Sequence, residues 1–193
     1  MILAILQARM SSSRLPGKVL MPLAGAPMLA RQIERVQRAK RIDRLILATS
    51  VRADDDAVAG VADAMGIGCY RGALDDVLDR TCRAAAPYAP THVVRLTGDC
   101  PLADWDVIDR TIGFALAGGY DYASNTLRPT WPDGLDVEVA TFATLKIAAN
   151  EATSPRDREH VMPYITSRPD RFRLGSYEHD RDLSALRWTV DEP

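Results

Sequence analysis

The sequence predicts an α/β fold, a doubly wound and mostly parallel sheet with flanking helices. Two observations carry this prediction. Apolar runs of strand length alternate with stretches whose apolar residues recur at helical spacing, which is the order of βαβ units in a parallel sheet. The chain has 193 residues and 47% of them are hydrophobic, which is enough to bury one full core. We therefore expect a single domain over residues 1–193, with a small insertion or arm.

The elements of the first half follow this alternation. The apolar run at 2–6 predicts a buried strand, and the helical spacing of Leu29, Ile33 and Val36 predicts the helix after it. The elements expected next are a strand at 45–48, a helix through Val58, Val61 and Met65, a short strand before Arg71, a helix at 77–86 and a strand at 92–96. The run Asp54 to Asp56 is expected to cap the second of these helices, because carboxylates favour helix N-termini.

The second half opens with a helix at 104–117 that Gly118 and Gly119 close. The segment 128–134 is turn-rich and aromatic, and long irregular segments in compact domains are usually functional. We expect it to be a substrate-facing loop or a dimer arm. The remaining expected elements are a strand at 135–140, helices at 141–150 and 156–167, the second interrupted near Pro163, and a strand at 186–190.

The composition excludes several classes of partner. The formal net charge of −2 gives no basic field, so nucleic acid is not expected to bind. The opening apolar run is too short for a signal peptide or a membrane span, so no membrane association is expected. The cysteines, Cys69, Cys82 and Cys100, lie too far apart for a metal or redox pair. We expect them to be reduced thiols in a cytoplasmic protein.

A polar, cationic loop follows the first predicted strand. Its serines, Ser12 among them, and Gly17 leave backbone N–H groups free to point at anionic oxygens, while Arg9, Arg14 and Lys18 supply positive charge. This pattern indicates a polyphosphate cradle with an exposed lysine. The loop is not a P-loop, because that motif requires a glycine where Ser12 stands and a Ser or Thr where Val19 stands. The alternative is an ordinary connection that carries scattered surface cations.

Four segments carry a resemblance to a known family. The first is the cradle loop, with Ala8-Arg9, Ser12 and Arg14-Leu-Pro-Gly-Lys18. The others are LTGDCPL at 96–102, DGLDVEV at 133–139 and RWTVDEP at 187–193. In this order they resemble the cytidylyltransferases that make CMP-activated acidic sugars, above all the branch described as spore-coat polysaccharide biosynthesis protein F. The resemblance spans nearly the whole chain.

This resemblance implies a Rossmann-type, nucleotidyltransferase-like fold and a Mg²⁺-dependent cytidylyltransferase. In such an enzyme the hydroxyl of an acidic sugar attacks the α-phosphate of CTP and pyrophosphate leaves, in surface polysaccharide biosynthesis. The implied partners are CTP and a small sugar, and the implied assembly is a homodimer. Because the family usually continues beyond the last predicted strand, we expect either a C-terminally truncated form or an unusual packing of the final segment.

The nucleotide side of the site follows from the same loop. Arg9 and Lys18 are expected to contact phosphate and, with Asp99, to form the catalytic set. The other residues expected to bind the nucleotide are Ser12, Arg14, Ala8 through its backbone groups, and Arg71, which resembles a family position that contacts the base.

Two carboxylates follow predicted strands and suit a metal ion. Asp99 lies at the carboxyl end of the strand at 92–96, and Asp191 lies after the last predicted strand. Mg²⁺ prefers oxygen ligands and seldom has an all-protein cage, and by resemblance these two residues are its ligands. The alternative for Asp99 is a helix cap or a turn shaped with Gly98.

The sugar side is expected to use Asp136, Glu138 and His160. Asp136 and Glu138 alternate on one predicted strand and therefore share a face, while His160 lies in a segment that resembles a family acceptor-binding element. Two other functions stay open on the residues alone. One is a nucleotidyltransferase for another base or acceptor, because the cradle chemistry does not read a base. The other is a nucleotide-sugar-binding protein without turnover.

Overall fold

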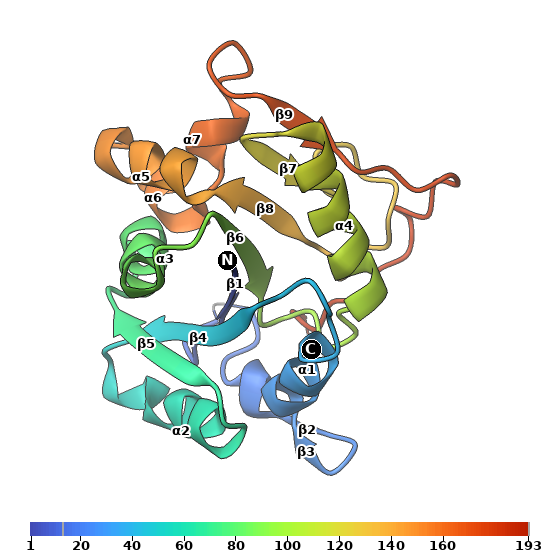
Figure 1. Cartoon of the computed structure of the whole chain (residues 1–193). Coiled ribbons are helices and arrows are strands. Elements are labelled where there is room, and N and C mark those ends of the chain that lie inside the picture. The colour runs from blue at the N-terminus through green and yellow to red at the C-terminus, as the bar shows by residue number, and fades with distance from the viewer. Residues whose placement is uncertain (13, 193) are drawn as a thin grey trace.

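The computed structural model describes residues 1–12 and 14–192. A seven-stranded sheet forms its centre, in the order β5-β4-β1-β6-β8-β7-β9 (Figure 1). The strands of this sheet are β1 (Ile2–Gln7), β4 (Arg44–Ser50), β5 (Gly68–Gly72), β6 (His92–Thr97), β7 (Tyr122–Ser124), β8 (Glu138–Thr141) and β9 (Leu174–Ser176). A short hairpin of β2 (Pro22–Leu23) and β3 (Ala26–Pro27) stands apart from it.

The sheet is mostly parallel, as the βαβ rhythm predicts. β1 pairs in parallel with both β4 and β6, β4 pairs in parallel with β5, and β7 pairs in parallel with β9. Only β8 breaks the pattern among the described strands, because it runs antiparallel to β6 and β7. The carboxyl ends of β1, β4, β5 and β6 therefore lie along one edge of the sheet, where ligands gather in α/β folds.

Helices cover both faces of the sheet. They are α1 (Met28–Val36), α2 (Asp56–Ala64), α3 (Val77–Ala85), α4 (Trp105–Gly118), α5 (Phe142–Glu151), α6 (Pro155–His160) and α7 (Pro163–Thr166). Alternate residues of β1 face opposite sides: Ala4 and Leu6 pack with α1, α2 and α4, whereas Leu3 and Ile5 pack with α3, α5 and α7. Figure 1 shows α1 and α4 on one side and α3, α5 and α6 on the other.

Most predicted elements are confirmed, and their ends have local causes. The Asp104 carboxylate accepts hydrogen bonds from the first turn of α4, and Gly119 closes that helix in the left-handed conformation. The predicted interruption near Pro163 is also confirmed, because α6 ends at His160 and α7 begins at Pro163. The run Asp54 to Asp56 lies where α2 starts, but the structure shows no side-chain cap there.

Several strand predictions are corrected. The segment 186–190 forms no strand, and in the part of the chain that the structure describes its one isolated bridge joins Asp133 and Arg187. The strand expected at 135–140 begins only at Glu138, because the Asn125 side chain holds Leu135 and Val137 by hydrogen bonds in place of a neighbouring strand. β7 and β9 are absent from the prediction, since three-residue strands of mostly small residues give no periodic signal.

The aromatic segment 128–134 packs against another part of the same chain, and its role as a substrate-facing loop or a dimer arm stays a prediction. The Trp131 indole stacks on Tyr177, at 5.5 Å between ring centroids, and donates a hydrogen bond to the Tyr177 carbonyl oxygen. Its apolar surface is therefore partly covered by the same chain. Next to this segment, Leu186 and Trp188 expose 44% and 40% of their surfaces.

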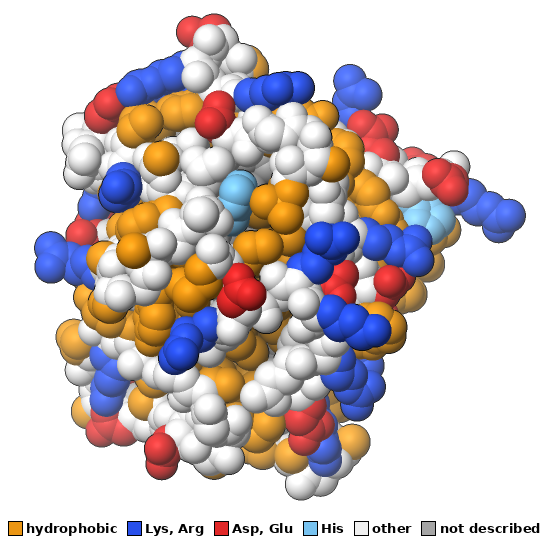
Figure 2. All heavy atoms as spheres, in the orientation of Figure 1, with side chains coloured by type: hydrophobic (Ala, Val, Ile, Leu, Met, Phe, Trp, Pro, Cys, Tyr) orange, Lys and Arg blue, Asp and Glu red, His pale blue; other side chains and the backbone are white. Residues whose placement is uncertain are grey.

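The surface carries no single-sign field on the face that Figure 2 shows, where basic and acidic side chains are interspersed. This agrees with the net charge of −2. None of the helices in the described part of the chain combines the length and the apolar character needed to cross a bilayer. The cysteines are all free thiols.

Candidate functional site

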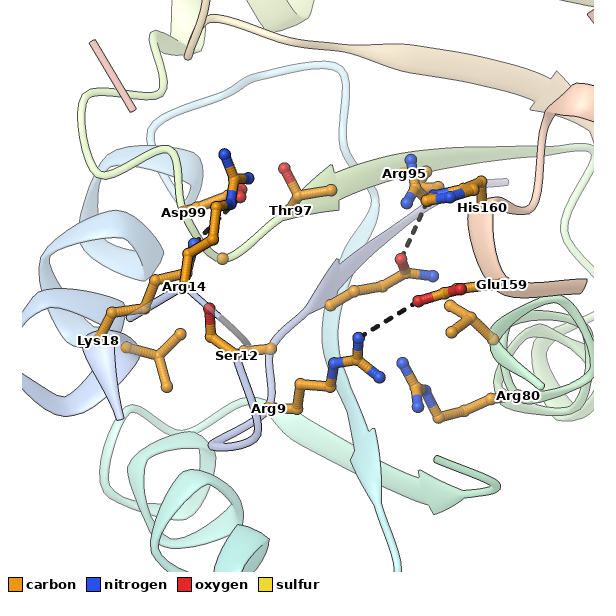
Figure 3. Close-up of a pocket in the computed structure, with 15 residues that line it drawn as sticks. Arg9, Ser12, Arg14, Lys18, Arg80, Arg95, Thr97, Asp99, Glu159 and His160 are labelled. Atoms are coloured by element: carbon orange, nitrogen blue, oxygen red, sulfur yellow. Dashed lines mark hydrogen bonds and ion pairs between the residues drawn. The ribbon is translucent and has the colours of Figure 1, made fainter. Parts of the chain in front are cut away.

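A cavity of about 450 Å³ lies at the carboxyl ends of β1 and β6 (Figure 3). The structure brings together here most residues that the sequence predicts for the site. These are Ala8, Arg9, Ser12, Arg14, Lys18, Asp99 and His160. The cavity lining also includes Glu159, from the segment that resembles an acceptor-binding element, and Gln7, Arg80, Arg95 and Thr97, which the sequence analysis does not anticipate.

The cradle loop is held in shape by its own backbone. The Met10 carbonyl oxygen accepts hydrogen bonds from the amides of Ser12 and Gly17, both at 2.9 Å. Gly17 has a φ of 73°, a left-handed conformation that glycine adopts without penalty. The Met10 amide donates to the carboxylate of Asp55, at 2.7 Å. Asp55 is 1% exposed and also binds Ser50, so it anchors the loop to the end of β4.

The ends of β1 and β6 approach each other closely beside the cradle. The Gly98 amide donates to the Gln7 carbonyl oxygen at 2.8 Å. A Cβ at Gly98 would stand 3.0 Å from both the Ala8 Cβ and that oxygen, so a larger residue would push the two strands apart. Gly98 thus lets Asp99 lie next to the loop that carries Lys18.

Lys18 and Asp99 form an ion pair at one end of the cavity. The Lys18 Nζ lies 3.3 Å from the Asp99 Oδ2. Lys18 is only 8% exposed, so the exposed lysine expected from the sequence is a buried one. Burial opposes ionisation of Asp99, but a hydrogen bond from Thr97 and the Lys18 charge hold the pKa of this carboxyl below its usual value. Asp99 is therefore an anion at neutral pH and not the cap of α4, whose cap is Asp104.

Asp191 lies close to Asp99 through the backbone, because the Val190 amide donates to the Asp99 carbonyl oxygen at 2.8 Å. Its carboxylate binds the guanidinium groups of Arg187, at 2.6 Å, and Arg14, at 2.7 Å. Burial opposes ionisation, but the hydrogen bonds of Arg187 and Thr189 hold the pKa of Asp191 below its usual value. Arg14 thus bridges the cradle and the C-terminal segment.

The donor set at this end suits Mg²⁺ in part. Asp99 offers an ionised oxygen ligand that lines the cavity. Asp191 is ionised too, yet both of its oxygens are bound by cationic groups, so metal binding there requires Arg14 and Arg187 to turn away. Among the described residues no three His, Cys, Asp or Glu side chains form a metal cluster. Two carboxylates completed by phosphate oxygens and water remain compatible with this ion.

The opposite end of the cavity is rich in arginine. Arg9 lies 3.6 Å from the Glu159 carboxylate of α6, and Arg80 of α3 lies beside it (Figure 3). Arg95 donates hydrogen bonds to the side chains of Gln7 and Glu138. Within the described lining, five cationic side chains face the carboxylates of Asp99 and Glu159. The cavity therefore has an excess of positive charge and suits a polyanion.

A second cavity of about 340 Å³ adjoins the first and shares Arg95 and His160 with it. Glu138 lines this second cavity, where its carboxylate accepts hydrogen bonds from Arg95 and from the Tyr122 hydroxyl. Arg95 and Glu138 are each 15% exposed at the side chain. The charges of Arg95 and Glu138 cancel each other. Unlike the first cavity, this cavity therefore has no excess of positive charge, and its polar groups can bind hydroxyls.

Asp136 lines neither cavity. Burial raises the pKa of this carboxyl to about 6, and the neighbouring carboxylates of Asp133, Glu138 and Asp99 act in the same direction. Its only hydrogen bond among the described residues comes from the Gly134 amide, at 3.4 Å. The shared strand face predicted for Asp136 and Glu138 therefore brings two carboxyl groups near each other, but only Glu138 reaches a cavity.

Arg71 lies outside both cavities. Its guanidinium donates to the carbonyl oxygens of Ser50 and Arg52 and pairs with the Asp56 carboxylate, at 2.6 Å. These contacts tie β5 to the start of α2. A base contact by Arg71 stays a prediction, and it would require the guanidinium to leave these three partners.

Two of the residues missed from the sequence had a signal. Arg95 interrupts the apolar strand His92–Thr97, and Arg80 lies between Val77 and Ala84 on the apolar stripe of α3. A cation on a face that should be buried is a candidate ligand group, since an unpaired buried charge is unfavourable. Gln7 and Thr97 had no comparable signal, because polar residues at strand ends are common.

A doubly wound sheet with a cationic cavity beyond the carboxyl ends of its central strands defines an α/β protein of the nucleotide-binding, nucleotidyltransferase-like class. Comparison with known proteins narrows this class. The sequence model described as cytidylyltransferase matches residues 3–189. The chain belongs to the cytidylyltransferase family and is a nucleotidyltransferase.

Individual relatives agree with this assignment. The chain is 34% identical to the spore coat polysaccharide biosynthesis protein SpsF of Bacillus subtilis, over 98% of its own length and 81% of that protein. It is 41% identical to a 3-deoxy-manno-octulosonate cytidylyltransferase of Anaeromyxobacter dehalogenans, over 61% of this chain and 48% of the relative. A solved cytidylyltransferase from Leptospira borgpetersenii superposes with a TM-score of 0.95 at 32% identity, covering 98% of this chain and 81% of that one. The resemblance seen in the four sequence segments is confirmed.

Proposed function

We propose that this protein is a Mg²⁺-dependent cytidylyltransferase that transfers CMP from CTP to the hydroxyl of an acidic sugar for surface polysaccharide biosynthesis. The observation that carries the proposal is the first cavity, whose described lining has five cations against two carboxylates. Such an excess of positive charge fits a triphosphate. The names of the similar proteins, a spore coat polysaccharide protein and an octulosonate cytidylyltransferase, support the acceptor class.

The cradle end would hold the triphosphate. Lys18, Arg14 and Arg9 line that part of the first cavity and can bind phosphate oxygens. Asp99 and Asp191 would hold Mg²⁺, which when bound supplies charge neutralisation at the α-phosphate and the departing pyrophosphate. Arg14 has Asp191 as its present partner, so a triphosphate would compete with that carboxylate for its guanidinium.

The second cavity would hold the acceptor. His160 and Arg95 lie on the boundary between the two cavities, so a sugar in the second cavity would present its hydroxyl toward the nucleotide in the first. The hydroxyl oxygen forms a bond to the α-phosphorus while the bond to the pyrophosphate oxygen breaks, and the hydroxyl proton passes to solvent. Catalysis then depends on positioning and electrostatic stabilisation, without a covalent enzyme intermediate.

A second candidate, a nucleotidyltransferase for another base, is favoured by one observation. Arg71 is held by Ser50, Arg52 and Asp56 and does not line the cavity. The cations that do line it bind phosphate whatever the base. Calorimetric binding of CTP, ATP, GTP and UTP, each with and without Mg²⁺, tests both candidates. Selective Mg²⁺-dependent binding of CTP supports the first, equal binding of all four supports the second, and no binding contradicts both.

The assembly and location are part of the same proposal. We propose a homodimer, because Leu186 and Trp188 leave apolar surface in water, and a cytoplasmic protein, because Cys69, Cys82 and Cys100 are free thiols. Light scattering at micromolar concentration tests the dimer. A monomeric mass would contradict it.

A further inference from the structure

Arg80 is a buried cation whose partners are incomplete. It lines the first cavity with 2% of its surface exposed. Its Nη1 donates to the carbonyl oxygens of Ala73 and Leu74, at 2.7 and 3.2 Å. Its Nε is buried and has no hydrogen-bond partner in the part of the chain that the structure describes. The Nη1 of this guanidinium thus binds the backbone, whereas the buried Nε–H binds nothing in the described part of the chain.

The charged groups around Arg80 do not compensate its positive charge. The carboxylates of Asp55 and Asp76 act on it favourably, but they are already bound by Met10 and Arg158. Arg9 and Arg95 are cations on the same side of the cavity and oppose its charge. Burial lowers the pKa of Arg80 to about 10, so it remains protonated at neutral pH. A buried charge in this position is unfavourable until an anion joins it.

A neighbour on the same helix shows the ordinary alternative. Arg83 lies three residues further along α3, has a side chain that is 69% exposed, and pairs with Asp79 at 2.7 Å. Solvent and a carboxylate therefore compensate the charge of Arg83, whereas Arg80 lines the cavity almost fully buried and forms no ion pair with a described carboxylate. Figure 3 shows Arg80 beside Arg9, across the cavity from Lys18 and Asp99.

We propose that Arg80 is a substrate-binding residue whose guanidinium receives an oxyanion of the bound substrate, either a phosphate of CTP or the carboxylate of the acceptor sugar. This inference rests on the proposed function, because it needs an anionic substrate in the first cavity. It adds a second anion-binding position to that cavity, separate from the Lys18 end. Arginine favours binding an oxyanion through two N–H groups at once. Because the Nε–H is buried, the guanidinium must turn toward the cavity to offer it to the oxyanion.

The test compares Arg80→Met and Arg80→Lys with the matched control Arg83→Met. Calorimetry measures the affinity for CTP, CMP and cytidine, and steady-state kinetics with CTP, Mg²⁺ and 3-deoxy-manno-octulosonate measure the KM of the acceptor. For the ligand that carries the oxyanion, Arg80→Met should lose about tenfold to hundredfold in affinity, as expected for a hydrogen bond to a charged group. Arg83→Met should stay within about twofold, because exposed ion pairs contribute little.

The set of ligands whose binding weakens identifies which substrate supplies the oxyanion. Weaker binding of CTP with unchanged cytidine assigns Arg80 to a phosphate. CMP binding that is also weaker indicates the α-phosphate, and unchanged CMP binding indicates the β- or γ-phosphate. Unchanged CTP binding with a raised acceptor KM assigns it to the carboxylate. An equal loss for cytidine, or no change for any ligand, overturns the proposal. If the parent protein binds no CTP, the proposed function fails instead. Should Arg80→Met fail to fold, Arg80→Lys replaces it, since it keeps a donor for the Ala73 and Leu74 carbonyl oxygens but loses the planar guanidinium. Parental affinity for every ligand in Arg80→Lys then overturns the proposal.

Discussion

The cradle end of the first cavity and the second cavity share a border at Arg95 and His160, yet their charged groups are partnered in different ways. At the cradle end, Lys18 pairs with Asp99 at 3.3 Å, and Asp99 is ionised. In the second cavity, Arg95 and Tyr122 both bind Glu138, so its charge is compensated before any ligand arrives. The first arrangement suits an anion and a metal ion, and the second suits positioning of hydroxyl groups.

The largest expected effect tests the cradle end at Asp99. Asp99→Asn keeps the shape of the side chain but removes the charge that would bind Mg²⁺. We expect a loss of several kcal/mol of transition-state stabilisation, or a rate at least about hundredfold lower. The measurement is pyrophosphate release with saturating CTP, an accepted sugar and titrated Mg²⁺. Asp106→Asn is the control, because Asp106 is a partly exposed residue of α4 that pairs with Arg110 outside the cavity. Near-parental rates for Asp99→Asn would remove the metal site from this end.

Lys18→Met is expected to have the next largest effect, on nucleotide affinity. The change removes the buried ammonium of the cradle but keeps an apolar chain of similar length. A charge-assisted hydrogen bond is worth about 1.5–3 kcal/mol, so the Kd for CTP should rise about tenfold to hundredfold. Calorimetric titration with CTP measures it, with the exposed Lys40→Met as control. Equal CTP affinity in the variant and the parent would mean that Lys18 serves only to pair with Asp99.

Glu138→Gln probes the compensated pair in the second cavity. The variant leaves Arg95 partly buried with a weaker partner, which we expect to lower the free energy of unfolding by about 2–3 kcal/mol. Urea unfolding measures this change. CTP affinity should hardly move, because Glu138 lines only the second cavity. Glu151→Gln breaks the exposed pair with Arg171 and should destabilise less. A CTP affinity that falls as much as in Lys18→Met would show that the two regions are not independent.

The smallest expected effect is a pH dependence centred on Asp136. Its pKa rises from an ordinary 3.8 to about 6 on folding, so between these values the folded state binds more protons than the unfolded state. Stability from this group therefore falls as pH rises from about 4 to 6. At pH 7 to 8, Asp136→Asn should raise the free energy of unfolding by about 1–2 kcal/mol. Below about pH 4 the variant and the parent should unfold with the same free energy, because Asp136 is then protonated in both states. Thermal unfolding across pH measures it. A constant difference at every pH would contradict the shift.

Much of the fold was predictable because its information is local and periodic. The strand Ile2–Gln7 and the stripe of Leu29, Ile33 and Val36 follow from the spacing of apolar residues alone. The strand expected at 186–190 was wrong because an alternating pattern does not reveal whether a neighbouring strand is free to pair. In the structure that segment meets other backbone mainly at Asp133.

The candidate site was predictable where its residues follow one another in the cradle loop. Arg9, Arg14 and Lys18 lie together because they are close in sequence. The arginines from α3 and β6, Arg80 and Arg95, join them only through the packing of the sheet, which no single segment encodes. The burial of Lys18 has the same origin, since it depends on the approach of Asp99 that Gly98 allows.

The contact of Arg14 with Asp191 has a consequence for the order in which the molecule forms. These residues lie at opposite ends of the sequence, and their carboxylate–guanidinium contact of 2.7 Å closes a loop of nearly the whole chain. Contacts of such high sequence separation form slowly, because the entropy of closing the loop must be overcome first. During synthesis the cradle loop leaves the ribosome long before Asp191 does. Arg14 is therefore made long before its carboxylate partner, and the cradle loop gains this contact only after Asp191 has been added to the chain.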